Sequence, residues 1–245
     1  MLEQRLARLD DVIASADEPL DLVLCPELFA SGYHVGDTLH QLAETPHGPI
    51  FKRIAAIARE RGTAIVYGYP EAAGTQVYNS AAFVSADGEW LANHRKQLNS
   101  PGSFEEDYFT PGERSTLLTW RGLTVGLMIC YEVEFPEAVR ELALAGTQLV
   151  LVPTALGAQW DVVASRVVPA RAFENGIWLA YANHAGQENG LEYLGGSKIV
   201  APDGVIEADA GADAELISTV IDPARVTAAQ QRLPYLRDRD KYRHD

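Results

Sequence analysis

The stretch that decides the fold is residues 123–153, LTVGLMICYEVEFPEAVRELALAGTQLVLVP. Residues 123–130 form an apolar run of strand length, and residues 148–153 form a second one. Between them, residues 135–145 have the apolar spacing of an amphipathic helix. Two buried strands joined by a helix are typical of a sheet covered by helices, so this stretch predicts an α/β fold.

The same alternation of helices and strands continues in both directions from this stretch. Toward the N-terminus, the pattern predicts helices at 2–13 and 47–60, strands at 21–25 and 63–69, and a hairpin of strands 77–85 and 90–95. Toward the C-terminus, it predicts a helix at 162–175 and strands at 177–182, 198–200 and 216–221. No linker or repeat interrupts the chain, so we expect one domain over residues 1–245 with mixed sheets.

Composition and charge exclude several classes of function. Lys and Arg number 20 and Asp and Glu 34, which gives a formal net charge of −14. So acidic a chain repels phosphate backbones and anionic membranes, and we expect no nucleic-acid partner. The first residues show no signal peptide, and no apolar run reaches transmembrane length. With two cysteines and no CxxC pair, the sequence favours a soluble protein in the reducing cytoplasm.

Three reactive side chains directly follow predicted strands, where α/β folds place their sites. Cys130 ends a strand and is either a buried core cysteine or a nucleophile at a strand-to-helix turn. Glu27 is either a surface carboxylate or, within its apolar PELF segment, a desolvated base with a raised pKa. Lys96 is either a solvated lysine or a fixed cation beside a developing oxyanion. None of the three segments is specific alone.

In combination, the segments resemble the nitrilase superfamily of carbon–nitrogen hydrolases. The order of glutamate, lysine and cysteine agrees, and further similar segments extend the resemblance over nearly the whole chain from about residue 21. The similar segments are residues 26–29 (PELF), 31–33 (SGY), 95–96 (RK), 105–112 (EEDYFTPG), 130–132 (CYE), 135–137 (FPE), 152–155 (VPTA), 171–175 (RAFEN), 195–197 (GGS) and 234–237 (PYLR).

This resemblance implies a four-layer α-β-β-α sandwich and a hydrolase that cleaves small amides. Glu27 would act as base and Cys130 as nucleophile, and Lys96 with the backbone N–H of Tyr131 would stabilise the oxyanion. Glu105 matches the second glutamate of the family, which holds the lysine and the substrate amide. Members need no metal or organic cofactor and usually form homodimers or larger assemblies. They usually begin with a short strand, whereas this sequence opens on the predicted helix, so we expect that strand to be missing.

Several alternatives remain open at this stage. A nitrilase would use the same three residues, but nitrilases more often have Trp where this chain has Tyr131, so amides are favoured. Hydrolysis of N-carbamoyl compounds or ω-amides is a further specificity. A non-catalytic binding protein would not retain all three catalytic positions, and a Cys–His protease would leave the glutamate and lysine unexplained. Tyr33, Thr154 and Trp160 are candidates to contact the substrate.

Other chemically active residues receive structural interpretations. His94 is interpreted as a polar hairpin residue, and Cys25 as a core residue. Arg171 and Glu174 lie three positions apart on one predicted helix and are expected to form an ion pair.

Overall fold

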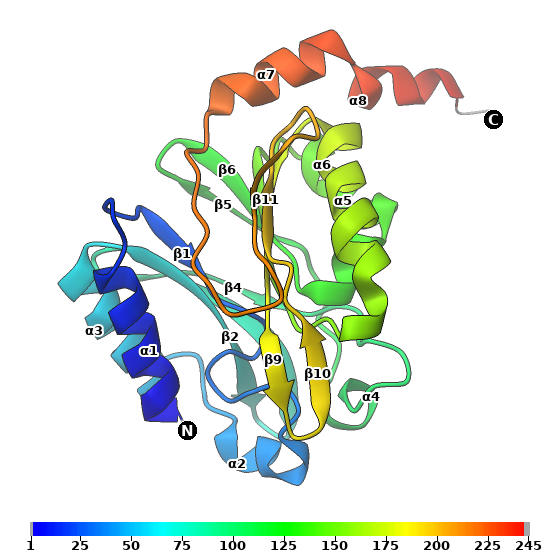
Figure 1. Ribbon diagram of the computed structural model, residues 1–245. Helices are drawn as coiled ribbons and strands as arrows, with labels where there is room; N and C mark the ends of the chain where they lie inside the picture. Colours follow the sequence, from blue (N-terminus) through cyan, green and yellow to red (C-terminus); the bar gives the residue numbers. More distant parts are fainter. Residues whose placement is uncertain (1, 243–245) are drawn as a thin grey trace.

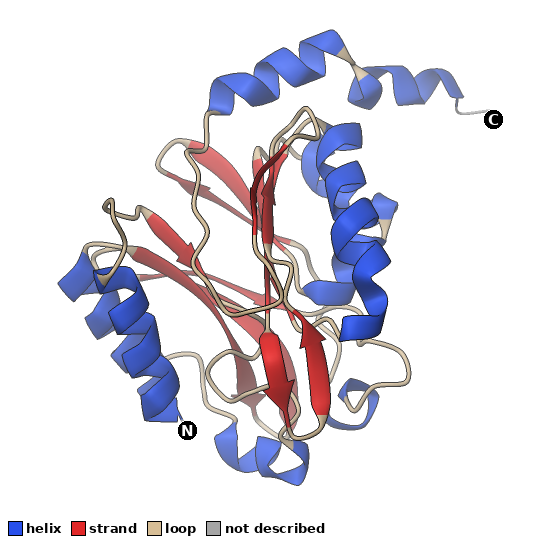
Figure 2. Cartoon of the chain, in the orientation of Figure 1, coloured by secondary structure: helices blue, strands red, loops and turns tan. Residues whose placement is uncertain are grey.

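The computed structural model of the chain describes residues 2–242. Two β-sheets pack face to face, and pairs of helices cover both outer faces (Figure 1). Helices α1 (Leu2–Ala14) and α3 (Pro49–Arg61) cover one sheet, and α5 (Pro136–Leu144) and α6 (Val168–Asn175) cover the other. The four-layer α-β-β-α sandwich expected from the sequence is therefore confirmed, as the layers of Figure 2 show.

The first sheet has the strand order β1-β2-β3-β4. Its first pair is parallel and the other two are antiparallel. The bounds are β1 (Leu22–Leu24), β2 (Ala64–Ala73), β3 (Gln76–Val84) and β4 (Trp90–Arg95). The predicted hairpin is confirmed by the pairing of β3 with β4. The first described element is helix α1, and β1 lies at an edge of this sheet.

The second sheet has the strand order β12-β11-β8-β7-β6-β5. Its centre, β6 to β8, is parallel, because α5 and α6 carry the chain back between successive strands. The bounds are β5 (Thr116–Trp120), β6 (Leu123–Leu127), β7 (Leu149–Thr154), β8 (Trp178–Asn183), β11 (Lys198–Val200) and β12 (Ile206–Asp209). This parallel centre explains the nearly continuous apolar runs from which the fold was predicted.

The core consists of three apolar layers. One lies between α1, α3 and the first sheet, and another lies between α5, α6 and the second sheet. The third lies between the sheets, where Phe83 from the first meets Leu127 and Trp178 from the second. Because the inner faces of both sheets are buried in this way, a polar side chain that enters between them is isolated from water.

The remaining elements lie at the edges of the sandwich. A small hairpin of β9 (Ala185–Glu188) and β10 (Leu191–Leu194) projects from the end of β8 (Figure 1). The short helices are α2 (Leu39–Leu42), α4 (Glu105–Tyr108) and α8 (Tyr235–Asp238), and α7 (Pro223–Arg232) packs over the end of the sheets. The predicted helix at 162–175 begins as a π-helical turn, Val163–Val167, and continues as α6.

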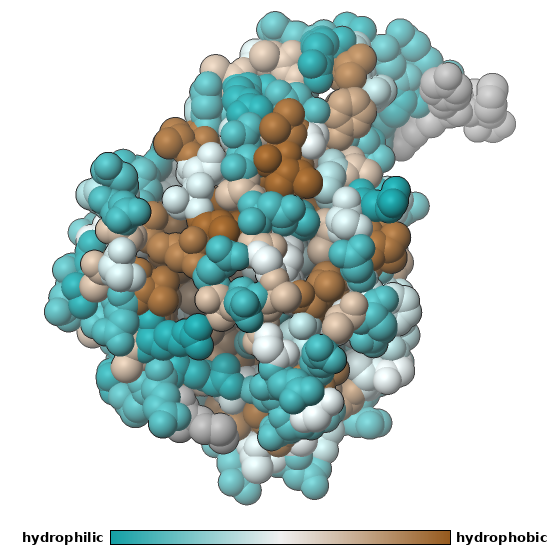
Figure 3. All heavy atoms as spheres, viewed as in Figure 1, coloured by the Kyte–Doolittle hydropathy of each residue, from teal (hydrophilic) through white to brown (hydrophobic). Residues whose placement is uncertain are grey.

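The strand predicted at 216–221 is wrong. The partner of β11 is β12, which follows the turn at 201–204 directly, and residues 216–221 have no strand assignment. This segment has residues of high β-propensity, but that propensity is expressed only when a neighbouring strand pairs with it. Leu216 and Val220 are exposed. Figure 3 shows separate hydrophobic patches among hydrophilic atoms on this face of the molecule.

None of the helices in the described part of the chain has the length and apolar character needed to cross a membrane.

Candidate active site

The candidate residues gather where strands of both sheets end. Glu27 follows β1, Lys96 directly follows β4, and Cys130 begins a short 3-10 helix, Cys130–Glu134, after β6. The backbone N–H of Glu27 donates to the carbonyl of Thr154 at the end of β7, 3.3 Å away. The first sheet therefore supplies the carboxylate and the amine, and the second sheet supplies the thiol.

Glu27 is fully buried, and its two carboxylate oxygens differ. Oε1 accepts hydrogen bonds from Lys96 Nζ at 2.8 Å and Asn79 Nδ2 at 2.7 Å. Oε2 is also buried but has no hydrogen-bond partner among residues 2–242. Burial raises the pKa of Glu27 to about 7 against the opposing effect of Lys96. A carboxyl with that pKa and one unpaired oxygen is suited to accept and return a proton near neutral pH.

Lys96 joins two carboxylates. Its side chain is inaccessible to solvent, and Nζ lies 2.8 Å from Glu27 Oε1 and 2.7 Å from Glu105 Oε2. Burial alone would lower the pKa of Lys96, but the two carboxylates outweigh it and raise the pKa above its ordinary value. The side chain is therefore held as the charged ammonium, which can stabilise a neighbouring negative charge.

Glu105 holds this lysine from the opposite side. Besides Lys96 it accepts hydrogen bonds from Tyr33 Oη at 2.5 Å and from the backbone N–H of Ser100 at 3.1 Å. Burial would raise the pKa of Glu105, but Lys96 and these donors hold it below the ordinary value. Two neighbouring glutamates thus have opposite pKa shifts: Glu105 stays ionised, and Glu27 titrates near neutrality.

Cys130 is held in a strained conformation at the turn. Its φ is +48°, in the left-handed region that side chains other than glycine rarely adopt. Burial, followed by the nearby charge of Glu27, raises the pKa of the thiol well above its ordinary value. The resting group is therefore a thiol, and it needs a base to become a nucleophile.

Glu132 fixes this turn to the strand that carries the lysine. One oxygen accepts from the backbone N–H of Gln97 at 2.8 Å, and the other accepts from the N–H of Ile129 at 2.5 Å and contacts His94 Nε2 at 2.9 Å. His94 lies in strand β4 of the predicted hairpin, as expected, and the structure adds that its ring is buried beneath the turn at Cys130. The turn and the lysine segment are thereby held as one unit.

Arg171 supports the same turn from helix α6. Its guanidinium donates to the carbonyl groups of Val133 at 3.1 Å and Glu134 at 2.6 Å, and to Glu174 Oε1 at 3.0 Å. The ion pair of Arg171 with Glu174 expected from the sequence is confirmed, and the arginine also satisfies two carbonyls of the turn. Cys25 is buried in the core as expected.

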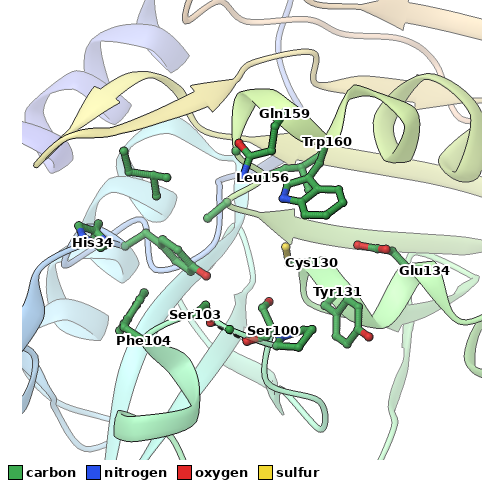
Figure 4. A pocket seen from close by; sticks show the side chains of 16 residues that line it. His34, Ser100, Ser103, Phe104, Cys130, Tyr131, Glu134, Leu156, Gln159 and Trp160 are labelled. Atoms are coloured by element: carbon green, nitrogen blue, oxygen red, sulfur yellow. Dashed lines mark hydrogen bonds between the residues drawn. The ribbon is translucent and has the colours of Figure 1, made fainter.

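A pocket of about 440 Å³ opens over Cys130. Figure 4 shows the cysteine sulfur exposed to the pocket, with Trp160 and Gln159 on one side, Tyr131 and Glu134 on another, and His34 and Phe104 opposite. Tyr33 and Trp160 line the pocket, and their contact with the substrate stays a prediction. Thr154 is fully buried behind the wall and is not among the lining residues. A volume of this size suits a small molecule.

The sequence pattern of the carbon–nitrogen hydrolase family matches residues 1–231. The chain belongs to the carbon–nitrogen hydrolase family. It is 44% identical to the hydrolase in the pqqF 5′ region of Pseudomonas protegens, over 96% of this chain and 82% of that protein. It is 35% identical to an (R)-stereoselective amidase of a Pseudomonas species, over 96% of this chain and 85% of that one.

A solved structure shows the same architecture in a related enzyme. A mutant of the Nesterenkonia AN1 amidase from the nitrilase superfamily superimposes on this carbon–nitrogen hydrolase with a TM-score of 0.84. The two are 37% identical, and the match covers 96% of this chain and 90% of the other. The resemblance to the nitrilase superfamily is thus confirmed, and this chain is a hydrolase that acts on carbon–nitrogen bonds.

Sequence reasoning missed three residues of this carbon–nitrogen hydrolase that contact Glu27 or its surroundings. Asn79 is a polar residue within the apolar strand β3, which was the only available signal. His184 Nε2 lies 2.6 Å from the carbonyl oxygen of Glu27. Glu188 accepts hydrogen bonds from the backbone N–H groups of Tyr33 and His34, each at 2.8 Å. The hairpin β9–β10 thereby fixes the pocket wall that contains Tyr33.

Within the part of the chain that the structure describes, no group of three or more His, Cys, Asp or Glu side chains is arranged to hold a metal ion.

Proposed function

We propose that this protein is an amidase that hydrolyses small carboxylic amides to the acid and ammonia through a thioester on Cys130. The observation that carries the proposal is the buried Glu27–Lys96–Glu105 chain beneath a pocket lined by Cys130. It combines a base that titrates near neutrality, a permanent cation and a thiol that needs a base. Apolar residues would stabilise the core at these positions at least as well as buried charged groups do. Buried charges in a pocket floor therefore indicate a catalytic role.

The first half of the reaction forms the acyl-enzyme. Glu27 Oε2 takes the proton of Cys130, and the thiolate attacks the substrate carbonyl carbon to form a carbon–sulfur bond. Lys96 and the backbone N–H of Tyr131 stabilise the resulting oxyanion. When the tetrahedral intermediate collapses, the carbon–nitrogen bond breaks, and Glu27 passes its proton to the leaving nitrogen, which departs as ammonia.

The second half releases the acid. Glu27 removes a proton from a water molecule, which attacks the thioester carbonyl in the space that ammonia has left. The second tetrahedral intermediate collapses with cleavage of the carbon–sulfur bond. Glu27 returns its proton to the sulfur, so that the resting thiol and carboxylate are restored.

Related structures support an amide substrate. The Nesterenkonia AN1 amidase has been solved as a mutant in complex with butyramide, and that protein is 38% identical to this chain. Another structure of it has the acetamide moiety of fluoroacetamide attached to the active-site cysteine. We infer that short aliphatic amides enter the pocket of this chain in the same manner.

The test is ammonia release from acetamide, propionamide and butyramide, with the matching nitriles, α-ketoglutaramate and N-carbamoyl amino acids measured in parallel. Wild-type protein is expected to hydrolyse the simple amides and not the nitriles. Cys130→Ala is expected to abolish turnover, and Lys96→Ala to lower it by roughly 10²–10³-fold or more, as for other lost oxyanion donors. Release from nitriles alone would favour a nitrilase with the same residues, and near-normal activity of Cys130→Ala would refute the mechanism.

We also propose that the protein assembles as a homodimer or a larger homo-oligomer and works in the cytoplasm. Exposed apolar side chains on and beside α5, α6 and α8 support the assembly: Leu144, Phe173 and Tyr235. Light scattering after size-exclusion chromatography would measure the mass, and a monomer at micromolar concentration would contradict the proposal.

A further inference from the structure

Among the described residues that line the pocket over Cys130, one has an acidic side chain, Glu134. This residue ends the 3-10 helix that begins with the cysteine, and Figure 4 shows its carboxylate on the side of the pocket formed by Tyr131 and Trp160, turned toward the sulfur. The proposed mechanism gives it no task. Arg171 donates a hydrogen bond to the backbone carbonyl of Glu134, which fixes the position from which the side chain extends.

The carboxylate of Glu134 has no partner within the described part of the chain. Neither of its oxygens makes a hydrogen bond or an ion pair with any residue between 2 and 242. Burial raises the pKa of Glu134, with only partial compensation from Lys96 and Arg171. A half-buried carboxylate that faces a cavity and lacks a matching cation is a binding group for a donor or a positive charge from outside the protein.

The described wall has no Lys or Arg opposite this carboxylate, and its basic side chain, His34, lies across the pocket from Glu134. Neither Lys nor Arg is among the described residues that line the pocket. Lys96 lies below the floor, and its charge is already matched there by Glu105 and Glu27. The negative charge of Glu134 would therefore repel an anionic substrate, and no lysine or arginine in the described wall would pair with that substrate's charge. An ammonium group would instead form an ion pair with Glu134 at low solvent exposure.

We propose that Glu134 selects the acyl portion of the substrate by charge, so that amides bearing an ammonium group are preferred over their neutral isosteres and carboxylate-bearing amides are rejected. This inference rests on the proposed amidase function and specifies its substrate class. It disfavours α-ketoglutaramate and N-carbamoyl amino acids, because both carry a carboxylate.

The test compares pairs of amides that differ in charge and not in shape. The pairs are 3-aminopropanamide with butyramide, 4-aminobutanamide with pentanamide, and succinamate with 4-methylpentanamide. For each pair, the ratio of kcat/KM for the charged amide to that for the neutral amide is measured in wild type and in Glu134→Gln. The expected result is that the substitution lowers the ratio for at least one cationic pair about tenfold and raises the ratio for succinamate.

Glu141→Gln is the matched control. It removes the same charge from an exposed position on helix α5, so its ratios should remain those of wild type. Equal changes in both variants would show an effect of net charge and would overturn the local role of Glu134. Ratios unchanged in Glu134→Gln would also overturn it. So would a parallel loss for neutral and cationic amides, which would show that Glu134 binds the amide group itself.

Failure of the proposed function gives a different result. If no amide in the series is hydrolysed in a Cys130-dependent manner, the amidase mechanism fails. The charge preference is then decided by calorimetric titration of Cys130→Ala protein, with and without Glu134→Gln, using 3-aminopropanamide and butyramide. Tighter binding of the cation that depends on Glu134 supports the inference, and equal binding of both amides overturns it.

Discussion

Glu27 and Glu105 are the same residue type bound to the same ammonium group, yet their pKa shifts have opposite signs. The difference follows from the number of donors that each carboxylate receives. Glu105 is bonded through both oxygens, to Lys96, Tyr33 and Ser100, which favours its ionised form. Glu27 leaves one buried oxygen without a partner, so the cost of desolvation dominates. In the proposed mechanism, the same difference separates the group that positions the lysine from the group that transfers protons.

The raised pKa of Glu27 predicts the acid limb of the pH profile. Glu27 accepts a proton only as the carboxylate, and the fraction in that form increases as the pH rises through about 7. We therefore expect kcat/KM to fall with decreasing pH below about 7, measured with a neutral amide so that the substrate does not titrate. A limb centred near the ordinary glutamate pKa of about 4.3 would contradict the assignment.

The 3-10 helix Cys130–Glu134 is the element on which the site depends. It is too short to be stable by itself, and it starts at a residue with positive φ. Two side chains hold it to its neighbours: its own Glu132 ties it to the backbone at Gln97, after β4, and Arg171 ties it to helix α6. The strain at Cys130 persists because these contacts keep the turn in place.

Glu132→Gln tests this role. The amide can accept through one oxygen only, so one of the donors that now bind the carboxylate loses its acceptor. We expect the free energy of unfolding to fall by about 1–3 kcal/mol and kcat to fall at least about tenfold, with KM little changed. Urea unfolding and steady-state kinetics measure the two effects. Glu137→Gln, an exposed position of helix α5, is the control and should leave both unchanged.

Gly68 on strand β2 fixes the position of the Glu27 segment in another way. A Cβ at position 68 would overlap the backbone nitrogen of Leu28 and lie 2.8 Å from the carbonyl carbon of Glu27. The segment that contains the base therefore lies directly on the strand, and it donates a hydrogen bond from Ala30 to the carbonyl of Gly68 at 3.0 Å. Glycine is required here for close approach and not for backbone conformation.

Gly68→Ala should displace Glu27 from Lys96. We expect activity to fall by about a hundredfold or more, because a displacement of about 1 Å at a catalytic group has costs of that order. Gly211→Ala, where the nearest atom to the added Cβ is a side-chain oxygen 3.6 Å away, should retain activity. Ammonia release at saturating amide measures both. Full activity in Gly68→Ala would show that the backbone yields without moving the base.

At the scale of the whole molecule, the two sheets share one core and one site. Trp178 on β8 is the largest fully buried side chain. Its indole Nε1 donates to the carbonyl of Asp222 at 2.9 Å, and the guanidinium of Arg225 lies 5.0 Å from the ring centroid. The tryptophan therefore connects the core between the sheets to the start of helix α7, at the end of the sandwich away from the pocket.

Trp178→Phe is expected to affect stability and leave catalysis intact. The smaller ring leaves part of the core unfilled, and the carbonyl of Asp222 loses its donor. We expect the free energy of unfolding in urea to fall by about 2–4 kcal/mol, while kcat/KM at 25 °C stays within about twofold of wild type. Trp160→Phe, at a side chain that is 54% exposed, should change stability far less. A loss of activity without a loss of stability would contradict this separation.

Some features of the molecule follow from local sequence. The apolar runs of β6, β7 and β8, with helices between them, favour parallel strands, because such sheets have both faces covered. Glu27, Lys96 and Cys130 were each singled out because they follow predicted strands, and the resemblance of their segments to the nitrilase superfamily grouped them as one site. Local patterns of this kind depend on neighbouring residues alone.

Other features were decided only by the tertiary structure. The strand predicted at 216–221 does not form, because β-propensity needs a partner strand that no local pattern supplies. The burial of His94 under the turn at Cys130 and the approach of His184 to Glu27 depend on how the two sheets stack. The pKa of Glu27 depends on the same stacking. Sequence determined which groups are present at the strand ends, and the packing of one sheet on the other determined their solvation, because water is excluded only when both faces are in place.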